Sequence, residues 1–292
     1  MNLPAVLALS FAPVEQTHAW RDAALYALAL GMGSDPLDGD ELPYVHEGAA
    51  GGLQAVPSQC ATLAWLPFWQ RDPALAINWA RIVHGEMRFT LHQPLATQGQ
   101  VRAQHHIVAV QDKGPGRGVV MQVDKTLHCA STGAHLASLQ SVEFLRGDGG
   151  CGSHGQPPQT LPPLPADFAP DARMDIATPR SAALLYRLAS GDLMPIHADP
   201  AVARQAGFER PISHGLNNLG LACRAILKRY LPGQPGRVQA MAVRFAQPGL
   251  PGDTVRVEMQ RLGDVIRFRA RALERGVLLL DRGECRLQGF QA

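Results

Sequence analysis

The segment at residues 186–221 constrains this chain most, because it places an acidic and a basic side chain on one irregular loop. Asp192 follows Gly191 after an apolar, helix-compatible run, and His197 comes five positions later. Pro195 interrupts any helix between them, so both side chains are expected on a loop. Loops on a rigid scaffold frequently carry catalytic groups.

Two helices are predicted after this loop. Asp199 and Pro200 have the pattern of an N-cap followed by proline at the first helical position, and Gly207 ends that helix. A longer, largely buried helix begins at or near Gly215 and continues to Tyr230. The free N–H groups and the dipole at its start favour a developing negative charge. An acid, a base and such a donor are what addition of water to an activated double bond requires.

The combination of these residues is more specific than any one of them. An isolated Asp in a Gly-Asp turn usually serves the turn. The strings GDLMPIHADP and AGFERPISHGL, however, resemble the signature of the MaoC-like dehydratases, specifically the two-domain (R)-specific enoyl-CoA hydratase 2 group. The resemblance implies an α+β double hot-dog fold, in which an antiparallel sheet wraps around a long helix. It implies that Asp192 and His197 are the catalytic pair and that the N–H of Gly215 meets the thioester oxyanion.

Three more residues of these strings are expected at the substrate-binding surface: Met194, Pro195 and His214. We expect His214 to orient the turn that presents Gly215. Met194 departs from the family, which has Asn at this position, and a thioether cannot donate a hydrogen bond. Losing one positioned donor can cost roughly 10²- to 10³-fold in rate, so reduced rather than abolished activity is expected.

Composition excludes several other classes. The 292 residues suggest one large or two small domains, and 46% hydrophobic content supplies a core. A net charge of +2, without a basic stripe, argues against a nucleic-acid partner. The cysteines are scattered without a C-x-x-C pair, which disfavours a metal site or a disulfide framework and suits a reducing cytoplasm: Cys60, Cys129, Cys151, Cys223 and Cys285.

Neither end of the sequence indicates targeting or a membrane partner. The first residues, MNLPAVLALSFAP, are too short to span a bilayer and lack the basic start of a secretory signal, so a buried first strand is expected. The last residues, GFQA, carry no peroxisomal address of the S-K-L kind. Cytoplasmic localisation is therefore the expectation.

The two halves of the chain show a similar order of elements. In the first half we predict a helix at 20–30, an extended segment at 41–47, a buried helix within 57–69 and strands at 87–91, 101–110, 119–126 and 135–145. In the second we predict a strand at 174–179 and, after the helices, strands at 238–246, 254–261, 265–273 and 277–288. Residues 149–172, rich in Gly and Pro, are the expected linker between domains at 1–148 and 173–292.

Short echoes support a duplication. The dipeptides His-Gly and Arg-Phe occur in this order in both halves, at different spacings. In the first half they are His84-Gly85 and Arg88-Phe89, and in the second His214-Gly215 and Arg244-Phe245. The first half has no G-D-x-x-P-x-H string, so it is expected to be a degenerate copy that shapes the substrate pocket. Three tryptophans, at positions 65, 69 and 79, fit core packing better than the wall of an acyl pocket. DAALYALALG, ELPYVHE and FLRGDGGCG extend the family resemblance over nearly the whole chain.

The function that these features imply is reversible hydration of a trans-2-enoyl-CoA to the (R)-3-hydroxyacyl-CoA, with a medium, long or bulky acyl chain. Neither a metal nor a cofactor is expected, since the substrate itself carries coenzyme A, and family members commonly form homodimers. Two alternatives stay open. One is a hot-dog acyl-CoA thioesterase, and the other is a protein that binds acyl thioesters without turnover, because Met194 replaces the family Asn.

Overall fold

The computed structural model describes residues 1–288; the expectation for GFQA lies at residues 289–292, outside the described residues. The α-helices are α1 (Leu3–Leu7), α2 (Trp20–Ala29), α3 (Leu42–Val45), α4 (Ala182–Ser190), α5 (Pro200–Gln205) and α6 (Gly215–Tyr230). Six 3₁₀ turns are interspersed: η1 (Pro57–Ala61), η2 (Trp69–Arg71), η3 (Pro73–Leu75), η4 (Trp79–Arg81), η5 (Pro195–His197) and η6 (Pro235–Arg237). The first-half strands are β1 (Val14–His18), β2 (Ile82–Leu91), β3 (Gly99–Asp112), β4 (Val119–Cys129) and β5 (His135–Leu145). The second-half strands are β6 (Ala172–Ala177), β7 (Val238–Phe245), β8 (Thr254–Leu262), β9 (Val265–Ala272) and β10 (Val277–Leu287).

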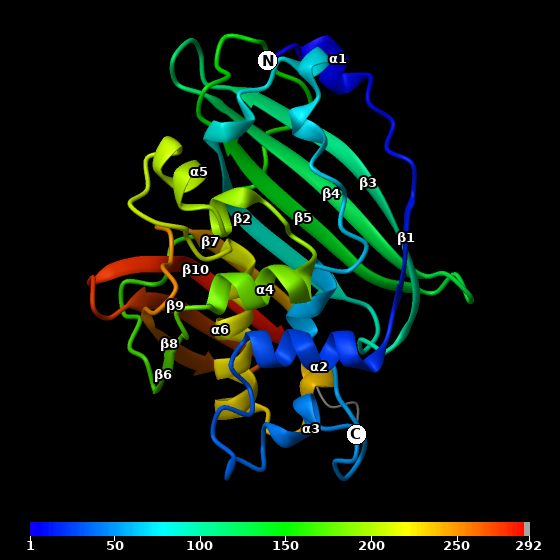
Figure 1. Ribbon diagram of the computed structural model, residues 1–292, viewed down its shortest axis with the longest axis vertical. Helices are drawn as coiled ribbons and strands as arrows, with labels where there is room; N and C mark the ends of the chain where they lie inside the picture. Colours follow the sequence, from blue (N-terminus) through cyan, green and yellow to red (C-terminus); the bar gives the residue numbers. More distant parts are fainter. Residues whose placement is uncertain (289–292) are drawn as a thin grey trace.

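All ten strands form one antiparallel sheet, with the order β1-β3-β4-β5-β2-β7-β10-β9-β8-β6 (Figure 1). Counted from its own outer edge, each half has the same order: first strand, third, fourth, fifth, second. The halves join where β2 pairs with β7, from Glu86 opposite Arg244 to Thr90 opposite Ala240. This repeated topology confirms the predicted α+β double hot-dog fold.

The halves differ in what covers the sheet. In the second half, the sixteen-residue helix α6 is almost entirely buried and packs against β6, β8, β9 and β10. In the first half the corresponding part of the chain is irregular, with η1 to η4 crossing the sheet (cyan in Figure 1). The prediction of a buried helix within 57–69 is therefore wrong beyond the single turn η1. Ala64 adopts a left-handed conformation, with φ of 48°, and Pro67 follows, so a helix cannot continue through this segment.

A buried lysine holds the irregular segment against the sheet. Lys125 on β4 donates hydrogen bonds to the carbonyl oxygens of Cys60, Ala61 and Leu63, at 3.1, 3.2 and 2.9 Å. These carbonyls lie at the end of η1, where a longer helix would have supplied N–H partners. The ammonium group therefore satisfies the backbone that the shortened helix leaves open.

Two predictions near the amino terminus are wrong. The expected first strand is the helix α1, where the Asn2 side chain accepts a hydrogen bond from the Ala5 N–H. The expected extended segment at 41–47 contains the helical turn α3, with Pro43 in its first turn. Both segments are short, and proline near the first helical position favoured helix over the extended state.

The sequence echoes correspond only in part. Arg88-Phe89 lies on β2 and Arg244-Phe245 on β7, which are equivalent strands of the two halves. His84-Gly85, in contrast, lies within β2, whereas His214-Gly215 forms the start of α6. The Arg-Phe echo therefore marks equivalent strands of the two halves, whereas the His-Gly echo is coincidental.

Buried contacts tie the two halves into one unit. Arg224 of α6 forms a buried ion pair with Glu41, with Nε–Oε1 and Nη2–Oε2 distances of 2.5 and 2.9 Å, and also donates to the Leu30 carbonyl. Leu30 lies so close to Gly220 that a Cβ there would be 2.4 Å from a Leu30 methyl.

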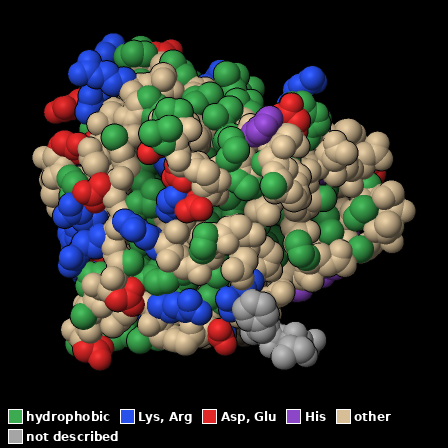
Figure 2. Space-filling view, turned by 90° about the horizontal axis from the view of Figure 1, so that it is seen from below, with side chains coloured by type: hydrophobic (Ala, Val, Ile, Leu, Met, Phe, Trp, Pro, Cys, Tyr) green, Lys and Arg blue, Asp and Glu red, His purple; other side chains and the backbone are tan. Residues whose placement is uncertain are grey.

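On the face drawn in Figure 2, acidic and basic side chains are interspersed. No helix among residues 1–288 is long and apolar enough to cross a membrane.

Candidate active site

A cavity of about 790 Å³ extends between the two halves and is lined by residues from both. All six residues singled out from the sequence line it: Asp192, Met194, Pro195, His197, His214 and Gly215. Its volume is in the range of pockets that bind small-molecule ligands. The loop between α4 and α5 and the start of α6 therefore face one common space.

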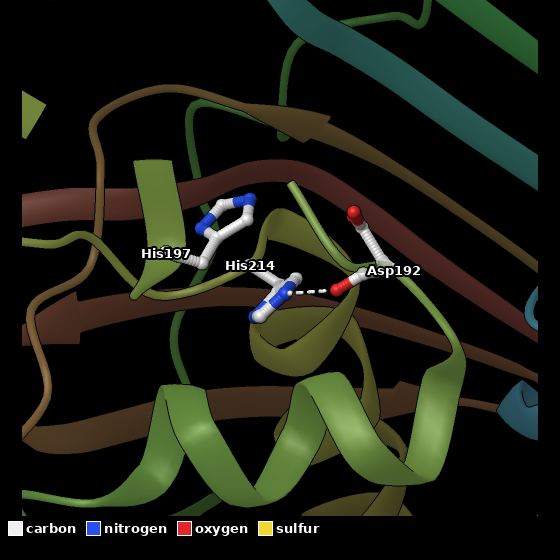
Figure 3. Close-up of side chains that lie close together, drawn as sticks. All are labelled: Asp192, His197 and His214. Atoms are coloured by element: carbon white, nitrogen blue, oxygen red, sulfur yellow. Dashed lines mark hydrogen bonds between the residues drawn. The ribbon is translucent and has the colours of Figure 1, made fainter. Parts of the chain in front are cut away.

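Local hydrogen bonds shape the loop that carries Asp192. Helix α4 ends at Gly191, which has a φ of 75°. Residues with a side chain rarely adopt this left-handed conformation, so glycine is favoured at this turn. The Asp192 N–H donates to Ser190 Oγ at 3.2 Å, and the Met194 N–H donates to Asp192 Oδ1 at 3.1 Å. Pro195 then opens η5, which ends at His197. The Asp192 carboxylate is thereby held beside the cavity (Figure 3).

The hydrogen bonding of His197 leaves one ring nitrogen open. His197 is 9% exposed, and its Nδ1 lies 2.8 Å from the Ile212 carbonyl oxygen. Because a carbonyl oxygen only accepts, Nδ1 carries the hydrogen and Nε2 keeps its lone pair. Burial lowers the pKa of His197, while the Asp192 carboxylate opposes that shift. The ring is therefore a neutral imidazole with a base nitrogen beside a carboxylate.

His214 makes a positioning contact through Nε2, whereas its Nδ1 is buried and has no hydrogen-bond partner. As N-cap of α6 it donates from Nε2 to the Asp192 backbone carbonyl at 3.2 Å, the dashed line in Figure 3. Its ring stacks on His197, with centroids 3.7 Å apart, and packs against Tyr186 at 5.1 Å. Burial, with the neighbouring His197, lowers the pKa of His214 to about 3. His214 thus joins the Asp192 loop to the start of α6.

Gly215 is the first residue of α6, at the wall of the cavity. The Asn217 and Asn218 N–H groups return to the His214 carbonyl, at 3.1 and 3.4 Å. The N–H of Gly215, like those of any first helical residues, has no acceptor within the helix. A Cβ at Gly215 would lie 3.2 Å from the ring of Phe245, so glycine fits the close approach of β7. The position is suited to an oxyanion donor.

The side chains of Asp192, His197 and His214 have potential ligand atoms within 4.8 Å of one another, which raises the question of a metal ion. A metal binds an imidazole along the lone pair, in the ring plane. The two rings are stacked with only 24° between their planes, so their lone pairs run side by side rather than converging. The Nε2–H of His214 is also used by the Asp192 carbonyl. This arrangement does not fit a shared metal ion.

Sequence reasoning missed several residues of the site. Ser190 anchors Asp192 but belongs to no recognisable motif, and Phe245, noted only as part of a sequence echo, packs on Gly215. The interpretation of three tryptophans as core residues is only partly right: Trp69 and Trp79 pack against a hydrophobic core cluster, but Trp65, Trp69 and Trp79 all line the cavity as well. Trp65 and Trp69 lie in the irregular segment that was predicted as a helix, which hid their placement, whereas Trp79 lies beyond it in η4.

The fold and the site define a double hot-dog protein with a His–Asp pair at the wall of a ligand-sized cavity. Residues 17–147 match the family described as the MFE-2 hydratase 2 N-terminal domain, and residues 153–281 match the MaoC like domain. The chain belongs to the MaoC-like dehydratase family, in its two-domain enoyl-CoA hydratase 2 group.

Known proteins resemble the chain over most of its length. It is 31% identical to the peroxisomal enoyl-CoA hydratase 2 of Arabidopsis thaliana, over 96% of this chain and 93% of that protein. It is 34% identical to the peroxisomal multifunctional enzyme type 2 of Mus musculus over 87% of this chain, but spans only 34% of that protein. The crystal structure of a MaoC-like dehydratase from Phytophthora capsici superposes with a TM-score of 0.84 at 28% identity, covering 99% and 100% of the two chains.

Proposed function

We propose that the protein is a hydro-lyase that catalyses reversible hydration of a trans-2-enoyl-CoA to the (R)-3-hydroxyacyl-CoA. The observation that carries this proposal is the open Nε2 of His197 beside the Asp192 carboxylate, on the wall of a cavity large enough for an acyl chain. The relationship to an enoyl-CoA hydratase 2 supports the same reaction.

The acid–base step follows from the open groups. The pair formed by Asp192 and His197 holds one water, which loses a proton to the pair as its oxygen attacks C3 of the substrate. The pair returns a proton to C2 from the same side. Such a positioned group is worth roughly 10²- to 10⁴-fold in rate. Met194 and Pro195 line the cavity from the same loop, which supports their assignment to substrate binding.

The thioester oxygen gains negative charge during the attack, and the Gly215 N–H accommodates it at the start of α6. His214 positions this donor relative to the pair, because it joins the Asp192 backbone to the first turn of α6. Side chains and one backbone donor supply the acid, the base and the anion site. No cofactor beyond the coenzyme A of the substrate is needed for this reaction.

The same proposal extends to the organisation of the protein. The chain divides into a pocket-shaping domain at 1–148, a linker at 149–172 and a catalytic domain at 173–292, of which residues 173–288 are described. Leu184 and Leu188, one turn apart on α4, are 51% and 66% exposed, which supports assembly as a homodimer. Five free cysteines suit a reducing cytoplasm. Light scattering at several concentrations and fractionation of the cells test these two points.

The first experiment is stereochemical. The purified protein is incubated with medium- and long-chain trans-2-enoyl-CoAs, and the 3-hydroxyacyl-CoA enantiomers are resolved. An (R) product that His197→Ala abolishes supports the proposal. Release of free CoA from saturated acyl-CoAs would instead indicate a thioesterase. Binding without either product would indicate a non-catalytic role.

A further inference from the structure

The part of the cavity that the first half contributes is mostly apolar but contains a cluster of polar side chains. The sheet face there carries His84 on β2 and both Ser141 and Glu143 on β5, with Gln70 above them. In the antiparallel register, His84 lies opposite Glu143, and Ser141 is their neighbour on the same face. Ser141 Oγ and His84 Nε2 are 2.9 Å apart, and Gln70 donates to Glu143 Oε2 at 3.0 Å. We call these four residues the distal polar cluster.

A continuous wall leads from the expected thioester position to this cluster. Gly215 approaches the ring of Phe245, whose centroid is 4.6 Å from that of His84. His84 in turn contacts Ser141. An acyl chain that starts at the Gly215 N–H and runs into the first half passes the Phe245 ring and then meets the cluster.

The cluster faces an enclosed space rather than open solvent. Burial raises the pKa of Glu143 to about 7 and lowers that of His84 to about 4. Both side chains nevertheless keep some exposed surface and line the cavity. Their exposed atoms therefore border the cavity interior. Coenzyme A is large and highly charged and favours solvent, so the proposal places the acyl group against these buried side chains.

Glu143 is under-satisfied in the protein alone. Among residues 1–288, Gln70 is its one hydrogen-bond partner, and none of the ion pairs involves it. Placing a carboxyl group in such a pocket costs free energy unless it is hydrogen-bonded. Apolar rings, Trp69 and Trp79 among them, line the same cavity. A pocket that takes only hydrocarbon chains would be better served by an apolar residue at position 143.

We propose that the natural acyl chain carries a hydroxyl group remote from the thioester, and that Glu143 and the His84–Ser141 pair bind this hydroxyl. The proposal rests on the proposed function, since it assumes an acyl-CoA in the cavity. A hydroxyl both donates and accepts, which matches a carboxyl oxygen on one side and the imidazole–hydroxyl pair on the other.

A carboxylate at the same place on the chain fits less well. It would meet the Glu143 carboxyl group, and like charges at short range disfavour each other. The nearby ammonium of Lys125 already donates to three carbonyl oxygens, so it has no donor left for the ligand. The hydroxyl is therefore the group that the distal polar cluster selects.

The test compares trans-2-enoyl-CoAs of equal chain length that end in a methyl, a hydroxyl or a carboxylate group, over a series of lengths. At the optimal length the hydroxyl substrate is expected to have about tenfold higher kcat/KM than the methyl substrate, the value of one hydrogen bond to an ionisable group. Glu143→Leu should reverse this order, and Glu143→Gln should reduce the preference while keeping a polar group. Equal or better use of the methyl or carboxylate substrate at every length would overturn the proposal.

Ser141 offers a matched control within one strand. Ser141→Ala should lower the preference for the hydroxyl substrate severalfold, whereas Ser138→Ala should leave it unchanged, because Ser138 bonds His92 and His135 away from the cavity. Binding of saturated acyl-CoAs, measured by calorimetry, separates this proposal from the proposed function. Tighter binding of the hydroxyl compound supports the distal polar cluster even without turnover, and equal binding contradicts it.

Discussion

The imidazole rings of His197 and His214 lie face to face, with 3.7 Å between their centroids and 24° between their planes. Two cations at this separation would repel each other strongly, so at most one ring is charged. Burial and the neighbouring His197 lower the pKa of His214 to about 3, and its Nε2–H is bound to the Asp192 carbonyl. In the proposed mechanism, His197 is therefore the ring that exchanges protons with substrate.

The acid limb of the pH–rate profile should lie below the usual histidine range. His197 acts as a base only when neutral, and burial lowers its pKa from the ordinary value of 6.5. We expect kcat/KM to be constant down to that pH and to fall only at lower pH. In Asp192→Asn the residual activity should keep its plateau to still lower pH, because the carboxylate raises the pKa of His197. An acid limb centred above 6.5 would contradict this assignment.

Folding has to be monitored in the same experiment. His84 and His214 are buried in their neutral forms, with pKa values of about 4 and 3. The unfolded chain binds protons at those positions below about pH 6.5, so the free energy of unfolding falls as pH decreases from there. Circular dichroism at each pH distinguishes loss of the fold from protonation of His197.

Asp192→Asn should lower kcat by at least about 10²-fold with little change in KM, because the amide has no acid–base function. The amide oxygen can still accept from the Met194 N–H, so the loop should keep its shape. Asp199→Asn is the matched control, since Asp199 caps α5 through the Ala201 N–H and Asn caps equally well. Steady-state kinetics of both variants decide the point. Unchanged kcat in Asp192→Asn would remove Asp192 from the mechanism.

Local signals account for what the sequence predicted about the site. The cap at Asp199, the prolines and Gly215 lie within a few residues of the elements they start or stop, so their effects are readable from the chain. The predicted helix from Gly215 to Tyr230 is confirmed for this reason. Strands β2 to β10 were also predicted, because apolar and polar residues alternate along strands such as β4 and β9, but β1 (Val14–His18) was missed.

Contacts between distant segments account for the rest. The approach of Phe245 to Gly215 and the ion pair between Glu41 and Arg224 join residues that no local pattern connects. The segment at 57–69 has the apolar content of a buried helix, but its backbone is held by Lys125, 62 to 65 positions later. Propensity gave no indication of that tertiary contact, and the cavity depends on it.

Gly215→Ala should lower kcat about tenfold, because the added methyl group lies 3.2 Å from the Phe245 ring and displaces the first turn of α6 by a fraction of an ångström. A second change, Phe245→Leu, should restore part of the rate by making room. Gly39→Ala is the control, since a Cβ there meets no atom within 4 Å. Equal rates for Gly215→Ala and Gly39→Ala would contradict the expected displacement of the first turn of α6.

Met194→Asn should raise kcat, by up to about tenfold, because it supplies the side-chain donor that the family has at this position. The backbone contact from the Met194 N–H to Asp192 Oδ1 does not depend on the side chain, so the loop should persist. Met194→Leu keeps the position apolar and should leave kcat unchanged. A lower kcat in Met194→Asn would mean that the substrate needs an apolar contact there.

Arg224→Met should lower the free energy of unfolding by about 3 to 5 kcal/mol, because it leaves the Glu41 carboxylate buried without its cation. The double variant Glu41→Met with Arg224→Met should be much closer to the wild type, since a buried ion pair replaced by packed apolar side chains is often neutral. Arg256→Met is the control: its ion pair with Asp175 is partly exposed and should contribute at most about 1 kcal/mol. Urea unfolding of the four proteins gives these values. Arg224 belongs to α6 and Glu41 to the first half. A large decrease in the free energy of unfolding of Arg224→Met, with one cooperative transition, therefore means that the two hot-dog units unfold together. Two separate transitions would contradict a single folding unit.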